Sequence, residues 1–159
     1  MHFEGSTTIQ APRQSLWNFL TDPHRISRCF PGLVSMEVVE PDKEFRFVVK
    51  AKLGSIQPTF DLNVTYTTAT PPLRARLGVR GKGPNTHIGA SSFLMLDELD
   101  DGSTEMKWSF DLAAAGLVAR VGERLMKDVG QDLTTKFIAA VKETVEAAAA
   151  PVGVASAKV

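Results

Sequence analysis

Few side chains in this 159-residue chain are placed to do metal, nucleophilic or acid–base chemistry. The histidines are His2, His24 and His87, and none has a second ligand at a spacing typical of a metal site. Cys29 lies five residues after His24, but no third group is evident that would orient such a pair as a nucleophile and base. We therefore expect no bound metal and interpret Cys29 as a structural thiol.

Two carboxylates, Asp61 and Asp111, lie among apolar strand residues, but at the polar positions of an alternating pattern. This placement predicts solvated side chains. An inward-facing Asp61, Asp111 or Tyr66 would instead be a candidate acid or base with a shifted pKa. The Gly81-Lys82-Gly83 stretch ends a predicted strand and lacks the Ser or Thr of a phosphate-binding loop. The sequence thus assigns no catalytic residue.

Composition indicates a single globular domain with no general affinity for nucleic acid. Hydrophobic residues make up 43% of the chain, and 18 basic residues balance 18 acidic ones. Cys29 is the only cysteine, which excludes an internal disulfide and fits a reducing cytosol. We expect neither a signal peptide nor a membrane-spanning segment. The predicted organisation is one domain at residues 1–149 and a flexible Ala-rich tail at 150–159.

The N-terminal part predicts a strand followed by two short helices. A first strand is expected at His2–Ile9 and a helix at Arg13–Leu20, with Pro12 suited to its first turn. Asp22 is a plausible N-cap for a second, short helix that begins at Pro23 and ends at about residue 28. The Phe30-Pro31-Gly32 stretch then has the chemistry of a turn.

From Val34 the hydrophobic period changes to two, which predicts roughly six strands in succession. The clearest alternating runs are residues 45–53, 60–66, 73–79, 88–99 and 104–112. Pro71-Pro72 is expected to turn the chain, Gly81 to Pro84 to form a flexible stop, and Asp100-Asp101-Gly102 to form a hairpin. Strands joined by such short turns should pair antiparallel.

A long helix is predicted from about Gly116 to Ala149. Its apolar stripe comprises Val121, Leu125, Val129, Leu133, Phe137, Val141 and Val145. Gly122 and Gly130 fall within the apolar arc, although glycine costs about 1 kcal/mol relative to alanine inside a helix. They either allow a strand to approach the helix closely or leave room for a ligand between helix and sheet. The sequence leaves both interpretations open.

These elements predict an α+β fold in which a strongly curved antiparallel sheet wraps around the C-terminal helix. Each strand has one apolar face that needs cover. The final helix is the only element long enough to provide it.

Several short motifs, in this order and spacing, resemble one known family. In the first third they are Phe3-Glu4-Gly5, Ala11-Pro12, Trp17, Leu20, Asp22-Pro23, Cys29 and Pro31-Gly32. Further along they are Lys52-Leu53-Gly54, the glycines Gly81, Gly83 and Gly89 with Ser91, and the stretch Gly122 to Val129. Over about residues 1–146 the chain resembles the family of the G subunit of carbon monoxide dehydrogenase. This family belongs to the START-like (SRPBCC) helix-grip superfamily.

The resemblance implies a seven-stranded sheet that grips a long C-terminal helix, with a hydrophobic cavity between them. It also implies a non-catalytic accessory protein that links a molybdenum hydroxylase, such as aerobic carbon monoxide dehydrogenase, to the cytoplasmic membrane and the respiratory quinone pool. The implied ligand is an isoprenoid quinone, menaquinone or ubiquinone. The implied location is the cytoplasm, with peripheral membrane contact near Phe30, Leu33 and Val34.

Candidate ligand-binding residues follow from placing such a molecule between helix and sheet. They are Phe30, Leu33, Phe60, Leu62, Leu94, Trp108, Phe110, Gly122, Met126, Val129 and Leu133. We expect Gly122→Leu to fill the space and abolish binding. Two alternatives remain open, namely a cyclase- or hydratase-type enzyme acting on a small apolar substrate and a protein-only adaptor with a packed core.

Overall fold

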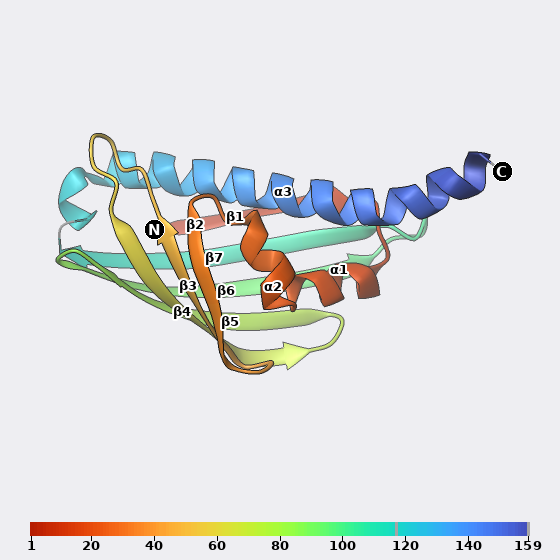
Figure 1. Cartoon of the computed structure of the whole chain (residues 1–159), viewed down its shortest axis with the longest axis horizontal. Helices are drawn as coiled ribbons and strands as arrows, with labels where there is room; N and C mark the ends of the chain where they lie inside the picture. The colour runs from red at the N-terminus through yellow and green to blue at the C-terminus, as the bar shows by residue number, and fades with distance from the viewer. Residues whose placement is uncertain (117, 159) are drawn as a thin grey trace.

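A curved antiparallel sheet packs against one long helix, α3 (Glu123–Lys158), in the computed structural model of the chain (Figure 1). Residues 1–116 and 118–158 are described, with side chains for all of these except 118–119 and 150–158. The sheet has seven strands in the order β1-β7-β6-β5-β4-β3-β2. This architecture confirms the predicted fold class.

The first elements match the sequence prediction closely. β1 (His2–Ile9) is followed by α1 (Arg13–Leu20), α2 (Pro23–Ile26) and the short 3-10 helix η1 (Ser27–Cys29). The Asp22 carboxylate accepts a hydrogen bond from the backbone N–H of His24 at 3.0 Å and so caps α2. Pro23 occupies the first turn of that helix, as predicted.

The remaining strands follow in succession and each pairs antiparallel with its neighbours. They are β2 (Leu33–Glu40), β3 (Glu44–Lys50), β4 (Thr59–Thr70), β5 (Arg74–Gly83), β6 (Thr86–Glu98) and β7 (Thr104–Gly116). β1 closes the far edge by pairing with β7. The hairpin turn at Gly102 confirms another prediction, with a φ of 86° at this glycine.

Two predicted strand ends were wrong. β3 stops at Lys50, and Leu53 lies in the β3–β4 loop, where its N–H bonds the carbonyl of Ile56 at 2.8 Å. β5 continues through the predicted flexible stop as far as Gly83. The glycine there has a packing role, because a Cβ at Gly83 would lie 2.8 Å from the Phe60 ring.

The long helix starts later than predicted. β7 runs to Gly116, a 3-10 helix η2 spans Val118–Val121, and α3 begins only at Glu123. Gly122 has a φ of 101°, in the left-handed region, so it separates η2 from α3 and is not a helix-interior residue. α3 also extends beyond the predicted end, to Lys158. The domain boundary at residue 149 and the mobility of the tail stay predictions.

A tightly packed core fills one end of the space between sheet and helix. It comprises Ile9, Leu16, Trp17, Leu96, Met106, Val141 and Val145, together with Ala11, Phe19, Ile26, Cys29 and Ala75. α1 lies beside the second half of α3 and α2 near its middle (Figure 1). Together they contribute Leu16, Trp17, Phe19 and Ile26 to this core. The other end of this space has no helix comparable to α1 among the described residues.

Candidate functional site

A cavity of about 440 Å³ lies between the concave face of the sheet and the first half of α3. Its sheet wall follows from strand geometry, because alternate side chains of each strand point to the same face. Phe60, Leu62, Val64 and Tyr66 of β4 illustrate this alternation. The volume falls in the range of about 300–1,000 Å³ typical of small-molecule sites. The site can therefore hold an organic ligand.

Nine of the eleven residues predicted to bind a ligand line this cavity. They are Phe30, Phe60, Leu62, Leu94, Trp108, Phe110, Met126, Val129 and Leu133. Leu33 is not part of the lining and instead packs against the cluster of Phe45, Phe47 and Val64. Gly122 is also outside the lining.

The two glycines of the predicted apolar arc have different roles. A Cβ at Gly122 would meet no atom within 4 Å, and its positive φ explains the glycine. The space at Gly122 is not part of this cavity, and a role of this residue in ligand binding stays a prediction. At Gly130 a Cβ would lie 2.6 Å from the ring of Phe3, so a side chain of β1 approaches the helix there. Gly130 also lines the cavity, so both interpretations apply to this residue.

Sequence reasoning missed several lining residues, and most of them carried a usable signal. The missed residues include Tyr66, Leu77, Val79, Ile88, Ala90, Leu112, Phe137 and Ile138. The strand residues occupy the same alternating positions as Leu62, Leu94 and Phe110, and Phe137 lies on the same helical stripe as Leu133. The lining from α1, α2 and the turn between them had no comparable signal, because it depends on how these helices dock. These residues are Leu20, Thr21 and Ile26.

Aromatic and aliphatic side chains close much of the cavity, and one exposed residue of the lining lies at its rim. Phe30 stacks on Phe137 of α3, with ring centroids 4.7 Å apart, and also contacts Phe47 at 5.0 Å. At the end near the β3–β4 loop, Leu53, Phe60 and Met126 form a buried cluster. Lys50, an exposed residue, is the only charged side chain among the described residues of the lining. It marks where the cavity reaches the surface.

The described part of the lining carries no carboxylate, histidine or cysteine. Tyr66 is its most strongly perturbed titratable group, since burial raises the pKa of this phenol to about 12. The Tyr66 hydroxyl donates to the carbonyl of Leu20 at 3.3 Å. At neutral pH this phenol is protonated, so it can donate a hydrogen bond but does not act as a base. Cys29 is buried in the packed core, and this burial raises the pKa of its thiol.

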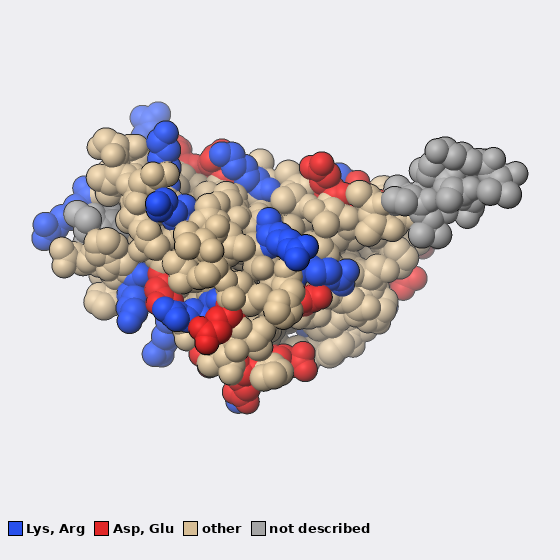
Figure 2. Space-filling view, viewed as in Figure 1, with Lys and Arg blue, Asp and Glu red and all other residues tan. Residues whose placement is uncertain are grey.

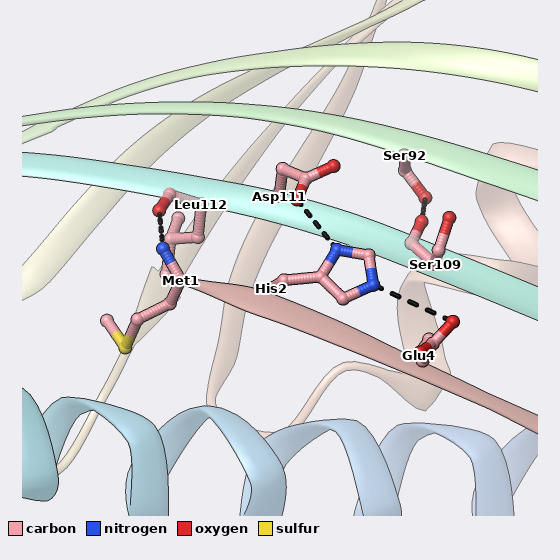
Figure 3. Close-up of polar contacts among 7 residues, drawn as sticks. All are labelled: Met1, His2, Glu4, Ser92, Ser109, Asp111 and Leu112. Carbon is pink, nitrogen blue, oxygen red and sulfur yellow. Dashed lines mark hydrogen bonds and ion pairs between the residues drawn. The ribbon is translucent and has the colours of Figure 1, made fainter.

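Both candidate carboxylates lie on the outer face of the sheet, as expected. Asp61 accepts a hydrogen bond from Arg46 Nε at 2.7 Å, and this bond lowers the pKa of the carboxyl. Asp111 accepts from His2 Nδ1 at 2.7 Å, and Glu4 is within 3.7 Å of the other ring nitrogen (Figure 3). The bond to Asp111 raises the pKa of His2. None of these groups lines the cavity.

Basic side chains gather at the end of the molecule that carries the start of α3 and the β3–β4 loop (Figure 2). The exposed cations there are Lys52 of the loop, Arg120 of η2, and Arg124 and Lys127 of α3. The exposed Ile56 lies in the same loop. Across the residues that the structure describes, no three His, Cys, Asp or Glu side chains gather as metal ligands, and no helix has the length and hydropathy to cross a bilayer.

The family model for the G subunit of carbon monoxide dehydrogenase (CoxG) matches residues 5–146. Similar solved structures include a conserved protein from Geobacillus kaustophilus, with 21% identity, a TM-score of 0.84, and coverage of 91% of this chain and 95% of that one. A START superfamily protein from Mycobacterium smegmatis has 10% identity, a TM-score of 0.69 and coverage of 91% and 97%. The Zhui aromatase/cyclase from Streptomyces sp. R1128 has 18% identity, a TM-score of 0.67 and coverage of 92% and 93%. At these identities the structures show a shared fold. No curated protein matches the chain in sequence.

Proposed function

Because the chain belongs to the family of the carbon monoxide dehydrogenase G subunit (CoxG), we propose that it is a non-catalytic accessory protein that carries an apolar ligand for a molybdenum hydroxylase. The observation that carries this proposal is the cavity of about 440 Å³ between the sheet and α3. An interior lined almost entirely by aliphatic and aromatic side chains binds a ligand through burial of apolar area, at about 25 cal/mol per Å².

The proposed ligand is an isoprenoid quinone, menaquinone or ubiquinone. Its ring suits the aromatic wall that Trp108 and Phe110 supply, and its chain suits the aliphatic wall near Leu62 and Met126. Phe30 contacts Phe47 and Phe137, and we propose that it opens and closes the rim. In this role the protein exchanges quinone between an enzyme such as carbon monoxide dehydrogenase and the respiratory chain.

The proposed location is the cytoplasmic face of the membrane, with peripheral contact. The basic end that includes Lys52, Arg124 and Lys127 supports this proposal, because anionic lipids attract such segments. Val34, 60% exposed on the edge strand β2, is an apolar side chain available for the same contact. Phe30 is engaged in aromatic stacking and is not free for it.

The two alternatives fare differently. A packed-core adaptor is disfavoured by the cavity itself. A cyclase-type enzyme is supported only by the inward position of Tyr66, since Asp61 and Asp111 face outward. A buried phenol with a pKa of about 12 donates a hydrogen bond and does not remove a proton at neutral pH. We therefore favour the carrier over the enzyme.

Native mass spectrometry of the purified protein, followed by organic extraction, tests the proposal directly. We expect a bound isoprenoid quinone, or stoichiometric uptake of added decylubiquinone. The cavity variant is Ala90→Phe, which adds a ring to an inward position of β6. Its matched control is Ala113→Phe, which adds the same ring to an exposed position of β7.

Ala90→Phe should weaken decylubiquinone binding at least tenfold, which corresponds to about 1.4 kcal/mol. Ala113→Phe should bind as the wild type does. If Ala90→Phe, shown to be folded by circular dichroism, bound the quinone with unchanged affinity, the cavity would not be the binding site. If the wild type took up no quinone, the carrier proposal would fail.

A further inference from the structure

Polar atoms are distributed unevenly along the cavity wall. The inner positions of the sheet form rows across the strands, and one row contains Tyr66, Leu77, Ser92 and Phe110. The next row towards the packed core contains Leu94 and Trp108. The rows on the other side, with Leu62, Gly81 and Ile88 or with Val64, Val79 and Ala90, have no polar side chain. The hydroxyl and indole groups of the sheet wall therefore lie together, next to the packed core.

Ser92, Tyr66 and Trp108 each carry a hydrogen-bond donor. Within the described residues these donors have either a long hydrogen bond or none. The Ser92 hydroxyl donates to the carbonyl of Ser109 at 3.3 Å (Figure 3), and the Tyr66 hydroxyl donates to that of Leu20 at the same distance. A well-formed O–H···O bond spans about 2.5–3.0 Å. The indole Nε1 of Trp108 is buried and has no partner among the described residues.

A buried donor without a partner is costly, and a ligand that brings an acceptor relieves that cost. We propose that Trp108, Ser92 and Tyr66 bind the carbonyl oxygen of an apolar ligand. This inference rests on the proposed role of the cavity as a ligand site. The carbonyl-bearing head then lies next to the packed core. The apolar tail extends towards Leu53 and Met126.

The position of Trp108 supports this assignment. The indole lies over Gly5 of β1, where a Cβ would be only 2.5 Å from the ring, so the glycine makes room for it. Ser92 and Trp108 are close neighbours, because Ser92 pairs with Phe110 and Leu94 pairs with Trp108. Because Nε1 is buried, we expect the ring to turn slightly so that its N–H reaches a ligand. Carbonyl binding should therefore move the Trp108 signal in a spectrum.

The chain offers an internal control, because it has two tryptophans. Trp17 is buried in the packed core and does not line the cavity. We would record the two indole N–H signals by ¹H–¹⁵N NMR while adding 5-nonanone or n-nonane, two probes of equal chain length that differ in one carbonyl. The ketone should shift the Trp108 signal downfield, and the alkane should shift it far less. The Trp17 signal should stay in place with either probe.

Affinities for the same probes, measured by displacement of bound N-phenyl-1-naphthylamine, give the second readout. In Trp108→Phe the ratio of ketone to alkane affinity should fall by about fivefold, as expected for one lost hydrogen bond. Trp17→Phe should keep the wild-type ratio. An unchanged ratio in Trp108→Phe, or equal Trp108 shifts with both probes, would overturn the assignment and leave the carrier proposal standing. Failure of the wild type to bind either probe would overturn both.

Discussion

The two halves of the α3 stripe have the same periodicity and opposite surroundings. Val129 and Leu133 line a cavity, whereas Val141 and Val145 are buried in close contact with other side chains. The difference comes from the elements that face each half. α1 places Leu16 and Trp17 against the second half, and no helix of the described chain fills the corresponding space beside the first half. Periodicity thus predicts which face of the helix turns inward but not whether that face meets protein.

Tyr66 lies at the boundary between the two regions and should contribute to a loss of stability at high pH. Its pKa is about 12 in the folded protein and about 10 when unfolded. Between these values the unfolded chain releases the proton while the folded chain keeps it, so stability falls as pH rises from 10 to 12. The loss should approach about 2–3 kcal/mol. Denaturant unfolding at pH 9 to 12 measures it.

Tyr66→Phe is the control for this pH effect, because it removes the only tyrosine of the chain. The variant should lose much less stability over the same pH interval. A wild-type phenol that titrated near pH 10 in ultraviolet absorbance would show that Tyr66 is solvated, and the boundary between hollow and packed regions would then be misplaced.

The same substitution in each half of α3 compares the two regions directly. Val141 is 0% exposed in the packed core, so Val141→Ala should cost about 2 kcal/mol through lost contacts and a new void. Val129→Ala enlarges an existing cavity and should cost less than about 1 kcal/mol. Urea unfolding of both variants gives the two values.

Equal losses for the two valine variants would contradict the comparison. They would mean that the first half of α3 is as closely packed as the second. Adding decylubiquinone sharpens the test. A ligand in the cavity should raise the cost of Val129→Ala and leave that of Val141→Ala unchanged.

The sequence predicted the fold well because each element carries a strong local signal. β1, α1 and the Asp22 cap of α2 were predicted at their observed positions. The lining was largely predictable, since alternation alone identifies Leu62, Leu94 and Phe110 as inward. No local pattern predicts how α1 and α2 dock. Their docking decides where the packed core ends and the cavity begins. The backbone angle of Gly122 was equally invisible, since a glycine in an apolar arc looks the same whatever its φ.

Gly122 gives a test with a smaller expected effect. A side chain there strains the backbone because φ is 101°, so Gly122→Ala should destabilise the fold by about 1 kcal/mol. Ligand affinity should not change, since Gly122 lies outside the cavity lining. Thermal unfolding should show a fall in Tm of about 2–4 °C. A large loss of quinone binding without loss of stability would return Gly122 to the ligand site.

The smallest effect is expected from a change to the His2–Asp111 pair on the outer face of the sheet. Such a change should alter surface electrostatics without altering the cavity. Strand alternation points Phe3 inward and its neighbours His2 and Glu4 outward. The hydrogen bond to Asp111 raises the pKa of His2 above 6.5. This pair therefore stabilises the fold fully below pH 6.5, and its contribution is lost as pH rises through the raised pKa. An NMR titration of the His2 ring should give a midpoint above 6.5 that Asp111→Asn lowers.

Quinone binding by Asp111→Asn should match the wild type, because the sheet backbone stands between this pair and the cavity. A shared change in both properties would mean that the two faces of the sheet are coupled.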